Sequence, residues 1–404
     1  MNLVQDWEEL IKDSFVLLSL TQDLVIHSNY HHGLRCAYLA EKIGEELIPE
    51  EKDILFFAGL LHDIGAPGGA FHLIHFPDLK IQMINDVIRE HSYNSAHLIR
   101  MFPFLFEGQH RIADYILHHH EWWKGVGYPR QLREEEIPLG ARILRAADAF
   151  DIYSRSGKDR NEITPENALH LLENNGEIDP VIYKILYNLC KGENFLYEYR
   201  LIENIFYSRY RKKEIKFLTS ELDGNLVYEY IGYVIESKLG TSSPGHIYAD
   251  VLYAVQIANA LGLSPQEVEE IKIASYLHDL GKLAIPSEII EKPALLTEKE
   301  WEIVRAHASL TIELLESVPS FKKFSFAGYH HERWDGKGYP QGLKEEEIPL
   351  GARIICIADA LDAMTSQRPY RPTLTFQEAL IEIEKNSGSQ FDPHIVPKVL
   401  EIYR

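Results

Sequence analysis

The sequence lacks any apolar run long enough to cross a membrane. Its longest apolar runs, such as Ile54 to Leu61, are far shorter than the roughly 20 residues that a transmembrane helix needs. The N-terminal stretch contains Asp6, Glu8 and Glu9 and has neither the basic region nor the apolar region of a signal peptide. These absences predict a cytoplasmic protein that does not contact membranes.

Cysteine is also scarce, because only Cys36, Cys190 and Cys356 occur among 404 residues. No two of them are closely spaced, so we expect neither a disulfide framework nor a thiolate zinc site. The sequence alone favours three small, buried, apolar side chains.

Basic residues are outnumbered, with 41 Lys and Arg against 61 Asp and Glu, which gives a formal net charge of −20. Such a surface repels long nucleic acids and anionic membranes. An anionic substrate must therefore meet a local exception, built from metal ions or from clustered Lys and Arg. The 45% apolar and 25% charged fractions are typical of a folded chain of two to three domains.

The apolar residues that are present recur at three- and four-residue intervals, which predicts helices. Examples are Leu34 to Ile48, Pro165 to Leu172, Val251 to Leu261 and Phe376 to Ile383. Alternating patterns between tight turns are scarce. We therefore predict an all-α fold.

An internal repeat is the most informative feature of the chain. The decapeptide Glu134 to Ile143 recurs without change as Glu345 to Ile354. Five further motifs recur in the same order: Leu61-His62-Asp63-Ile64-Gly65 and Leu277-His278-Asp279-Leu280-Gly281, His119-His120-Glu121 and His330-His331-Glu332, Gly127-Tyr128-Pro129 and Gly338-Tyr339-Pro340, Ala147-Asp148-Ala149 and Ala358-Asp359-Ala360, and Ile178-Asp179-Pro180 and Phe391-Asp392-Pro393. Six ordered matches indicate a duplication.

The repeat predicts four regions in the chain. These are an N-terminal helix over 1–27, a first copy over 28–195, a helical connector over 196–235 and a second copy over 236–404. The connector is rich in Tyr and Lys and lacks the Gly and Ser of a flexible linker, so we expect it to pack rather than to act as a tether.

Histidines and aspartates lie in or beside apolar helical patterns throughout the second copy. Polar groups in such places cost several kcal/mol unless they are paired or coordinated, and a whole set repeated in order points to a metal site. The candidate ligands are His246, His278, Asp279, His307, His330, His331 and Asp359. Imidazole and carboxylate without thiolate favour iron, manganese, cobalt, nickel or zinc over calcium or magnesium and do not choose among these five metals. Our first expectation is iron or manganese, with zinc, nickel or cobalt as alternatives. Two such ions can hold a hydroxide between them and clamp both oxygens of a phosphodiester.

The second copy resembles the HD-GYP subgroup of the HD phosphohydrolases. The resemblance is carried by the His-Asp pair 278–279, Asp359, His330-His331-Glu332 and the following Asp335-Gly336-Lys337-Gly338-Tyr339-Pro340. It implies two tandem helical bundles, each with a metal site in its core. It also implies hydrolysis of cyclic di-GMP or a related cyclic dinucleotide to a linear dinucleotide or to mononucleotides.

The same resemblance implies roles for individual residues. The candidate ligands would bind two divalent ions, with Asp279 bridging them, and Lys282 would contact the scissile phosphate. Arg368 and Arg371 would hold a phosphate or a guanine. The loop of Gly338, Tyr339 and Pro340 would lie near the site and could contact a partner such as a diguanylate cyclase; its glycine is expected to adopt a φ that other residues avoid.

Some members of the subgroup bind a third metal through an acidic residue four positions before the first histidine. Ser242 and Ser28 stand at this position in the two copies. We therefore expect two metals per intact site and a product that can stop at the linear dinucleotide.

The first copy retains candidate ligands but loses the residues that would hold a phosphate. Its ligands are His32, His62, Asp63, His91, His119, His120 and Asp148. Lys282 corresponds to Ala66, Asp335 to Lys124, and 368–370 to 157–159; only Arg160, opposite Arg371, is kept. We expect a metal-binding site with poor hydrolysis, which leaves a regulatory, a nucleotide-binding or a bracing role open.

Two other functions remain open on the sequence. One is a phosphohydrolase that acts on a different nucleotide. The other is a scaffold that senses a nucleotide or recruits a partner with little turnover, in which case partner binding would survive the loss of Asp279.

Overall fold

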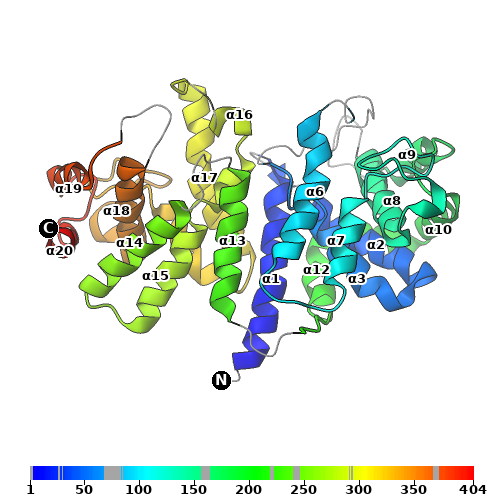
Figure 1. Ribbon diagram of the computed structural model, residues 1–404, viewed down its shortest axis with the longest axis horizontal. Helices are drawn as coiled ribbons and strands as arrows, with labels where there is room; N and C mark the ends of the chain where they lie inside the picture. Colours follow the sequence, from blue (N-terminus) through cyan, green and yellow to red (C-terminus); the bar gives the residue numbers. More distant parts are fainter. Residues whose placement is uncertain are drawn as a thin grey trace. The chain divides into compact units, whose positions relative to one another are not determined.

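Helices form nearly every described element of the computed structural model, as the apolar periodicity predicts (Figure 1). The structure describes residues 3–25, 28, 29, 31–67, 83, 85–155, 164–218, 223–239, 246–290, 292, 294–366 and 373–404, with only the backbone of His246. Among these residues the only strands are the two-residue segments β1 (Leu24–Val25) and β2 (Ser28–Asn29), which pair antiparallel. The all-α prediction is confirmed.

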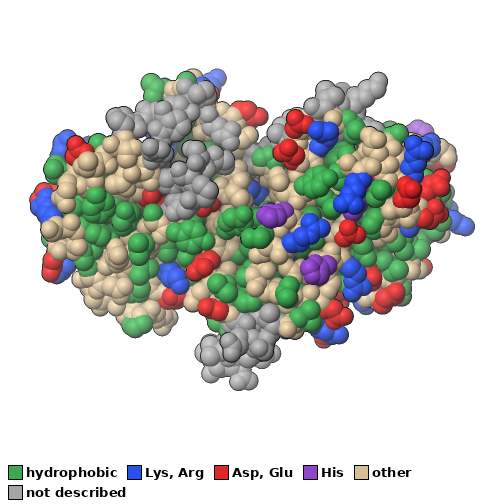
Figure 2. All heavy atoms as spheres, viewed as in Figure 1, with side chains coloured by type: hydrophobic (Ala, Val, Ile, Leu, Met, Phe, Trp, Pro, Cys, Tyr) green, Lys and Arg blue, Asp and Glu red, His purple; other side chains and the backbone are tan. Residues whose placement is uncertain are grey.

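The chain divides into two units, Met1–Leu222 and Asp223–Arg404. The predicted connector 196–235 spans this division, and the predicted limits of the two copies stay predictions. Within the described residues, no helix combines the length and the apolar character needed to cross a membrane. On the face in Figure 2, side chains of both charge signs are interspersed.

The first unit contains ten described α-helices and two short 3₁₀ segments. They are α1 (Leu3–Asp23), α2 (His32–Leu47), η1 (Pro49–Glu51), α3 (Lys52–Leu61), α6 (Asp86–Met101), α7 (Gln109–Leu117), η2 (Glu134–Glu136), α8 (Leu139–Ser154), α9 (Pro165–Leu172), α10 (Pro180–Cys190), α11 (Glu193–Arg200) and α12 (Ile202–Tyr210). Helix α2 packs on α3 and α8, and α6 packs on α7. Helix α1 is buried along most of its length against α2 and α3, so its role here is packing.

The second unit contains eleven described helical segments, and its central helices follow in a similar order. They are α13 (Gly224–Lys238), α14 (His246–Ala260), α15 (Pro265–Leu277), η3 (Leu280–Ala284), α16 (Ser287–Ile290), α17 (Glu298–Ser317), η4 (Lys322–Tyr329), η5 (Glu345–Glu347), α18 (Leu350–Thr365), α19 (Phe376–Lys385) and α20 (Val396–Tyr403). Helix α14 packs on α15 and α18, as α2 packs on α3 and α8. Helix α14 begins with the predicted ligand His246. It therefore packs against α15, which leads to His278, and against α18, which carries Asp359.

Capping signals explain where several of these helices begin. Ser264, Thr297 and Thr375 each form a capping box with a glutamate three residues later, at the starts of α15, α17 and α19. The identical decapeptides form identical structures, because each makes a 3₁₀ turn before a 16-residue helix, α8 or α18. These two helices carry Asp148 and Asp359.

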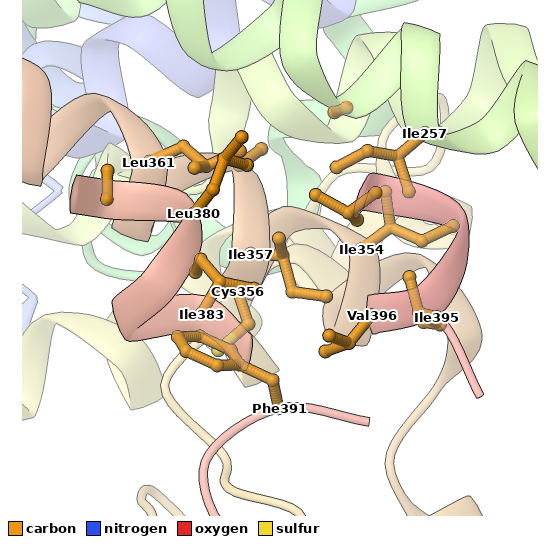
Figure 3. Packing of buried hydrophobic residues seen from close by; sticks show 14 of the residues in the cluster. Ile257, Ile354, Cys356, Ile357, Leu361, Leu380, Ile383, Phe391, Ile395 and Val396 are labelled. Carbon is orange, nitrogen blue, oxygen red and sulfur yellow. The ribbon is translucent and has the colours of Figure 1, made fainter. Parts of the chain in front are cut away.

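The core of the second unit lies between α14, α18, α19 and α20. Figure 3 shows Ile357 of α18 near Ile383 of α19 and Val396 of α20, all buried. In the first unit, aromatic rings fill the space behind α3, with the Phe56 and Phe206 ring centroids 5.8 Å apart and those of Phe206 and Tyr210 5.1 Å apart. Both cores hold the polar helices rigidly in place.

Candidate metal centres

Polar side chains in the second unit converge on Asp279, at the end of α15. The Nε2 atoms of His307 and His330 lie 3.6 and 3.7 Å from Asp279 Oδ1, and His278 Nε2 lies 3.3 Å from Asp279 Oδ2. The ring of His331 is packed against His330, with centroids 4.0 Å apart. Four histidines from α15, α17 and the end of η4 therefore surround one carboxylate.

Backbone carbonyls orient three of these histidines. The Nδ1 atoms of His278, His307 and His330 each bond the carbonyl oxygen three residues earlier, at 2.7, 2.5 and 2.8 Å. Since a carbonyl only accepts, Nδ1 carries the proton, and the neutral ring presents a lone pair on Nε2. This is the arrangement that orients a histidine toward a metal.

Three buried atoms of this cluster have no hydrogen-bond partner among the residues that the structure describes: Asp279 Oδ1, His307 Nε2 and His330 Nε2. A buried acceptor without a partner costs about 1–3 kcal/mol, which a coordinated ion would remove. Metal–nitrogen and metal–oxygen bonds of about 2.0–2.2 Å also suit donors separated by these distances. The donor set therefore fits a divalent metal.

Burial and neighbouring charges keep most of these histidines neutral. Burial, together with the Lys282 ammonium, lowers the pKa of His307 to about 4. Burial and neighbouring histidines lower the pKa of His330 and His331 well below the usual range. For His278 burial alone would lower the pKa, but the Asp279, Asp250 and Asp359 carboxylates raise it to about 10. The three carboxylates around His278 therefore favour the binding of a cation on this side of the cluster.

A pocket of about 740 Å³ opens beside the cluster and includes Asp359 in its wall. Three cationic side chains line it: Lys282, Arg305 and Arg333. Lys282 Nζ lies 2.5 Å from Asp279 Oδ2, and the Arg305 guanidinium lies 5.8 Å from the centre of the Tyr339 ring. These side chains form the locally positive region that an anionic ligand would need on a protein with a formal net charge of −20. Arg305, Arg333 and Trp301, which also lines the pocket, carried no motif in the sequence.

The Gly-Tyr-Pro loop covers one edge of the cluster. Tyr339 stacks on His331, with ring centroids 4.8 Å apart. The expected reason for Gly338 is wrong, because the left-handed φ belongs to Gly336, at 73°. Gly338 is needed because a Cβ there would lie 2.5 Å from the His331 carbonyl oxygen.

Asp250 is a site residue that the sequence analysis missed. It lies four residues after His246 on α14, is buried, and its Oδ1 has no hydrogen-bond partner. Burial and the Asp359 carboxylate raise its pKa well above the usual range. Its one signal in the sequence is the spacing of one helical turn from a predicted ligand.

Some predicted residues lie outside what the structure describes. Arg368, Arg371, Ser242 and the first-copy segment 157–160 are among the residues not described, and only the backbone of His246 is placed, as the first residue of α14. Their proposed roles stay predictions.

The first unit brings all seven of its predicted donors together. His32 Nε2 lies 3.2 Å from His62 Nε2 and 3.3 Å from Asp148 Oδ1. Asp63 lies between His62 and His91, with oxygens 3.2 and 3.5 Å from their Nε2 atoms. The same group contains His119 and His120, whose rings lie 5.3 and 4.8 Å from that of His91.

An arginine enters the first cluster. Arg145 Nη1 donates to His120 Nδ1 at 3.0 Å and to Asp148 Oδ2 at 2.6 Å, and its Nη2 donates to Glu177. The repeat places Cys356 opposite Arg145 and Gln390 opposite Glu177. The first cluster is therefore crossed by a buried ion-pair network that the second lacks the residues to form.

The cysteines depart from the sequence expectation in two cases, because Cys190 is only partly buried and Cys36 lies among polar donor atoms. All three are free. Cys36 is fully buried, but its Sγ lies 3.5 Å from His32 Nε2, within the donor group of His32, His62 and Asp148. Thus Cys36 is a potential metal ligand rather than an apolar filler.

Known proteins and a family model match both units of this chain. The family model described as HD domain matches residues 8–182 and 238–395. The 3′3′-cGAMP-specific phosphodiesterase 3 of Vibrio cholerae is 27% identical over 433 aligned residues, covering 94% of this chain and 92% of that protein. A cyclic di-GMP phosphodiesterase of Thermotoga maritima is 43% identical over 150 residues, which is 36% of this chain and 41% of that protein.

A solved structure shares the fold over both units. The crystal structure of a cyclic GMP-AMP-specific phosphodiesterase of Vibrio cholerae aligns with a TM-score of 0.65 and 24% identity, covering 97% of each chain. The match confirms the tandem helical architecture.

Proposed function

From the premise that the chain belongs to the HD-domain family, matched over both of its units, we propose that the second unit hydrolyses a cyclic dinucleotide in a metal-dependent reaction. Cyclic di-GMP is the first substrate to test, and the expected product is the linear dinucleotide. The observation that carries the proposal is a donor cluster fit for metal at the wall of a pocket lined by Lys282, Arg305 and Arg333.

The size and lining of the pocket support a nucleotide. Its volume of about 740 Å³ lies within the range of about 300–1,000 Å³ typical of small-molecule sites. The three cations can pair with phosphate oxygens, and Trp301 and Tyr339 offer aromatic faces on which a base can stack. A long nucleic acid would instead need an extended basic surface.

Seven residues would hold the metals: His246, His278, Asp279, His307, His330, His331 and Asp359. Two divalent ions bound there, with iron or manganese tested first, would supply Lewis-acid activation of water and of the phosphodiester. Lys282 would neutralise charge that develops on the phosphate, because its ammonium reaches Asp279 and also lines the pocket.

A second substrate, 3′3′-cGAMP, is favoured by one observation. A relative that matches almost the whole chain is named for this dinucleotide, whereas a relative named for cyclic di-GMP aligns with about a third of the chain. Both substrates present two phosphodiesters to the same kind of site.

The test is turnover of both dinucleotides by anaerobically purified protein supplied with Fe(II) or Mn(II), with products resolved by chromatography. We expect a linear dinucleotide from the wild type, none from Asp279→Ala, and near wild-type turnover from the matched first-unit variant Asp63→Ala. Circular dichroism would verify that both variants fold.

Failure to hydrolyse either dinucleotide at full metal loading would overturn the proposal. Tight binding without turnover would then favour a sensing or scaffold role. Equal loss in Asp63→Ala and Asp279→Ala would show that the second unit is not the sole hydrolase.

A further inference from the structure

We propose that the first unit binds one thiophilic divalent ion, of the zinc type, through His32, Cys36, His62 and Asp148. Arg145 donates hydrogen bonds to His120 and Asp148, which a second ion would need as ligands. The proposal concerns the first unit alone and is independent of which substrate the second unit hydrolyses.

Four donor atoms of different chemistry meet at this point. The Nε2 atoms of His32 and His62 are 3.2 Å apart, and Cys36 Sγ and Asp148 Oδ1 lie 3.5 and 3.3 Å from His32 Nε2. All four donor atoms lie within 4.8 Å of one another and belong to buried residues. Ligands at about 2.0–2.3 Å from a central ion are separated by distances of this order.

The helix α2 dictates half of this geometry. His32 and Cys36 are four residues apart, so their side chains lie one turn apart on the same face. Helix α2 packs on α3 and α8, and this packing brings in His62 and Asp148. The neighbours of Cys36 are thus potential ligands rather than apolar side chains.

The Nδ1 protons of both histidines are committed elsewhere. His32 Nδ1 bonds Asp151 Oδ2 at 2.7 Å, and His62 Nδ1 bonds the Gly59 carbonyl at 2.8 Å. Both partners are acceptors, so each Nδ1 carries a proton and the two Nε2 atoms face each other at 3.2 Å as a hydrogen-bonded pair. An ion bound to both Nε2 atoms would replace the proton that this pair shares.

Asp148 adds a carboxylate oxygen to the same point. The residue is fully buried, Oδ2 accepts from Arg145, and Oδ1 faces His32 Nε2 at 3.3 Å. One carboxylate and one thiolate contribute two negative charges, which match a divalent ion. The nearby Asp151 is already neutralised by Arg35, whose Nε lies 2.5 Å away.

Arg145 limits the site to one ion. Its guanidinium only donates, so His120 Nδ1 accepts and the neutral ring carries its proton on Nε2. That proton faces His91 Nε2 at 3.1 Å. His120 and His91 are therefore joined by a hydrogen bond and do not offer two lone pairs to an ion.

The Cys36 thiol determines which metal ion the site prefers. On binding, the Cys36 S–H bond breaks, the proton leaves to solvent, and a sulfur–metal bond forms without any change of oxidation state. A site of two imidazoles, a thiolate and a carboxylate favours zinc or cobalt, whereas the nitrogen and oxygen donors of the second unit suit iron or manganese. The two units would thus select different metals.

The test uses the full chain, stripped with a chelator and reloaded with Co(II), whose thiolate complexes show a charge-transfer absorption that nitrogen and oxygen ligands do not give. We expect this band in the wild type and in two control variants, Cys190→Ser and Cys356→Ser. In Cys36→Asp, which installs the donor of the equivalent Asp250, cobalt should remain bound while the band disappears.

A second measurement needs no variant. In wild-type protein loaded with one equivalent of zinc, X-ray absorption should detect one sulfur ligand at about 2.3 Å. Only nitrogen and oxygen ligands would overturn the proposal, as would a cobalt band that persists in Cys36→Asp or two ions retained by the first unit in Asp279→Ala protein.

Discussion

The two units carry the same predicted donors in the same order, but different side chains surround them. In the second unit the cluster forms the wall of a pocket with three cations, and Cys356 leaves room beside His331. In the first unit Arg145 fills the equivalent place and pairs with Glu177 and Asp148. The comparison shows that a donor set alone does not make a substrate site, because neighbouring charges decide whether the donors face a ligand or each other.

A second difference concerns the residue one turn after the first histidine. The first unit has Cys36 there, and the second has the buried carboxylate of Asp250. The first unit also pairs Arg35 with Asp151, whereas the second has Ala249 opposite Arg35. Each unit therefore presents its own donor chemistry on a common helical frame.

The largest expected effect comes from converting the second unit to the first with Cys356→Arg. The new guanidinium would reach His331 and Asp359 as Arg145 reaches His120 and Asp148, and would exclude one ion. We expect turnover to fall by about 1,000-fold or more and bound metal at this unit to fall by half. The control is Cys356→Ser, which should retain both. Unchanged turnover in Cys356→Arg would show that the arginine does not separate the two sites.

The reverse experiment removes the arginine from the first unit. Arg145→Ala leaves Asp148 and Glu177 buried without their partner, which should lower the free energy of unfolding by about 3–5 kcal/mol. Chemical denaturation followed by circular dichroism measures this loss. The double variant Arg145→Ala/Glu177→Gln should recover much of it; an equal loss in both would argue against a role for the ion pair.

Removing Lys282 tests the part of the pocket that the first unit lacks. Lys282→Ala should lower kcat by about 100-fold, since one transition-state charge contact is lost, with metal content unchanged. Lys337→Ala, an exposed lysine of the same unit, is the matched control. A change in KM alone would assign Lys282 to binding rather than to the reacting phosphate.

The smallest expected effect concerns the stacked tyrosines. Tyr339 is partly exposed on His331, whereas Tyr128 is buried on His120. Tyr339→Leu should lower the free energy of unfolding by about 0.5–1.5 kcal/mol, and Tyr128→Leu should cost more because more ring surface is buried. Thermal denaturation compares them. Equal losses would mean that burial does not distinguish the two loops.

The helical class, the duplication and most of the candidate donors could be predicted from the sequence alone. This was possible because helical periodicity and motif repetition are local along the chain. His278 and Asp279 are adjacent, and the decapeptide of α18 alone places Asp359 on a helix. These features can be recognised without knowing which side chains pack against them.

The side chains that surround the candidate donors could not be predicted from the sequence and are known from the packing of the helices. Arg145 and Glu177 are 32 residues apart, so no spacing rule links them. The sequence alone predicted that Cys36 is a buried apolar side chain. The packing of α2 on α3 and α8 places it in one donor group with His62 and Asp148. The reason is physical: charge pairing and coordination depend on distances of a few ångströms between side chains from different helices, and only the packing of those helices sets such distances.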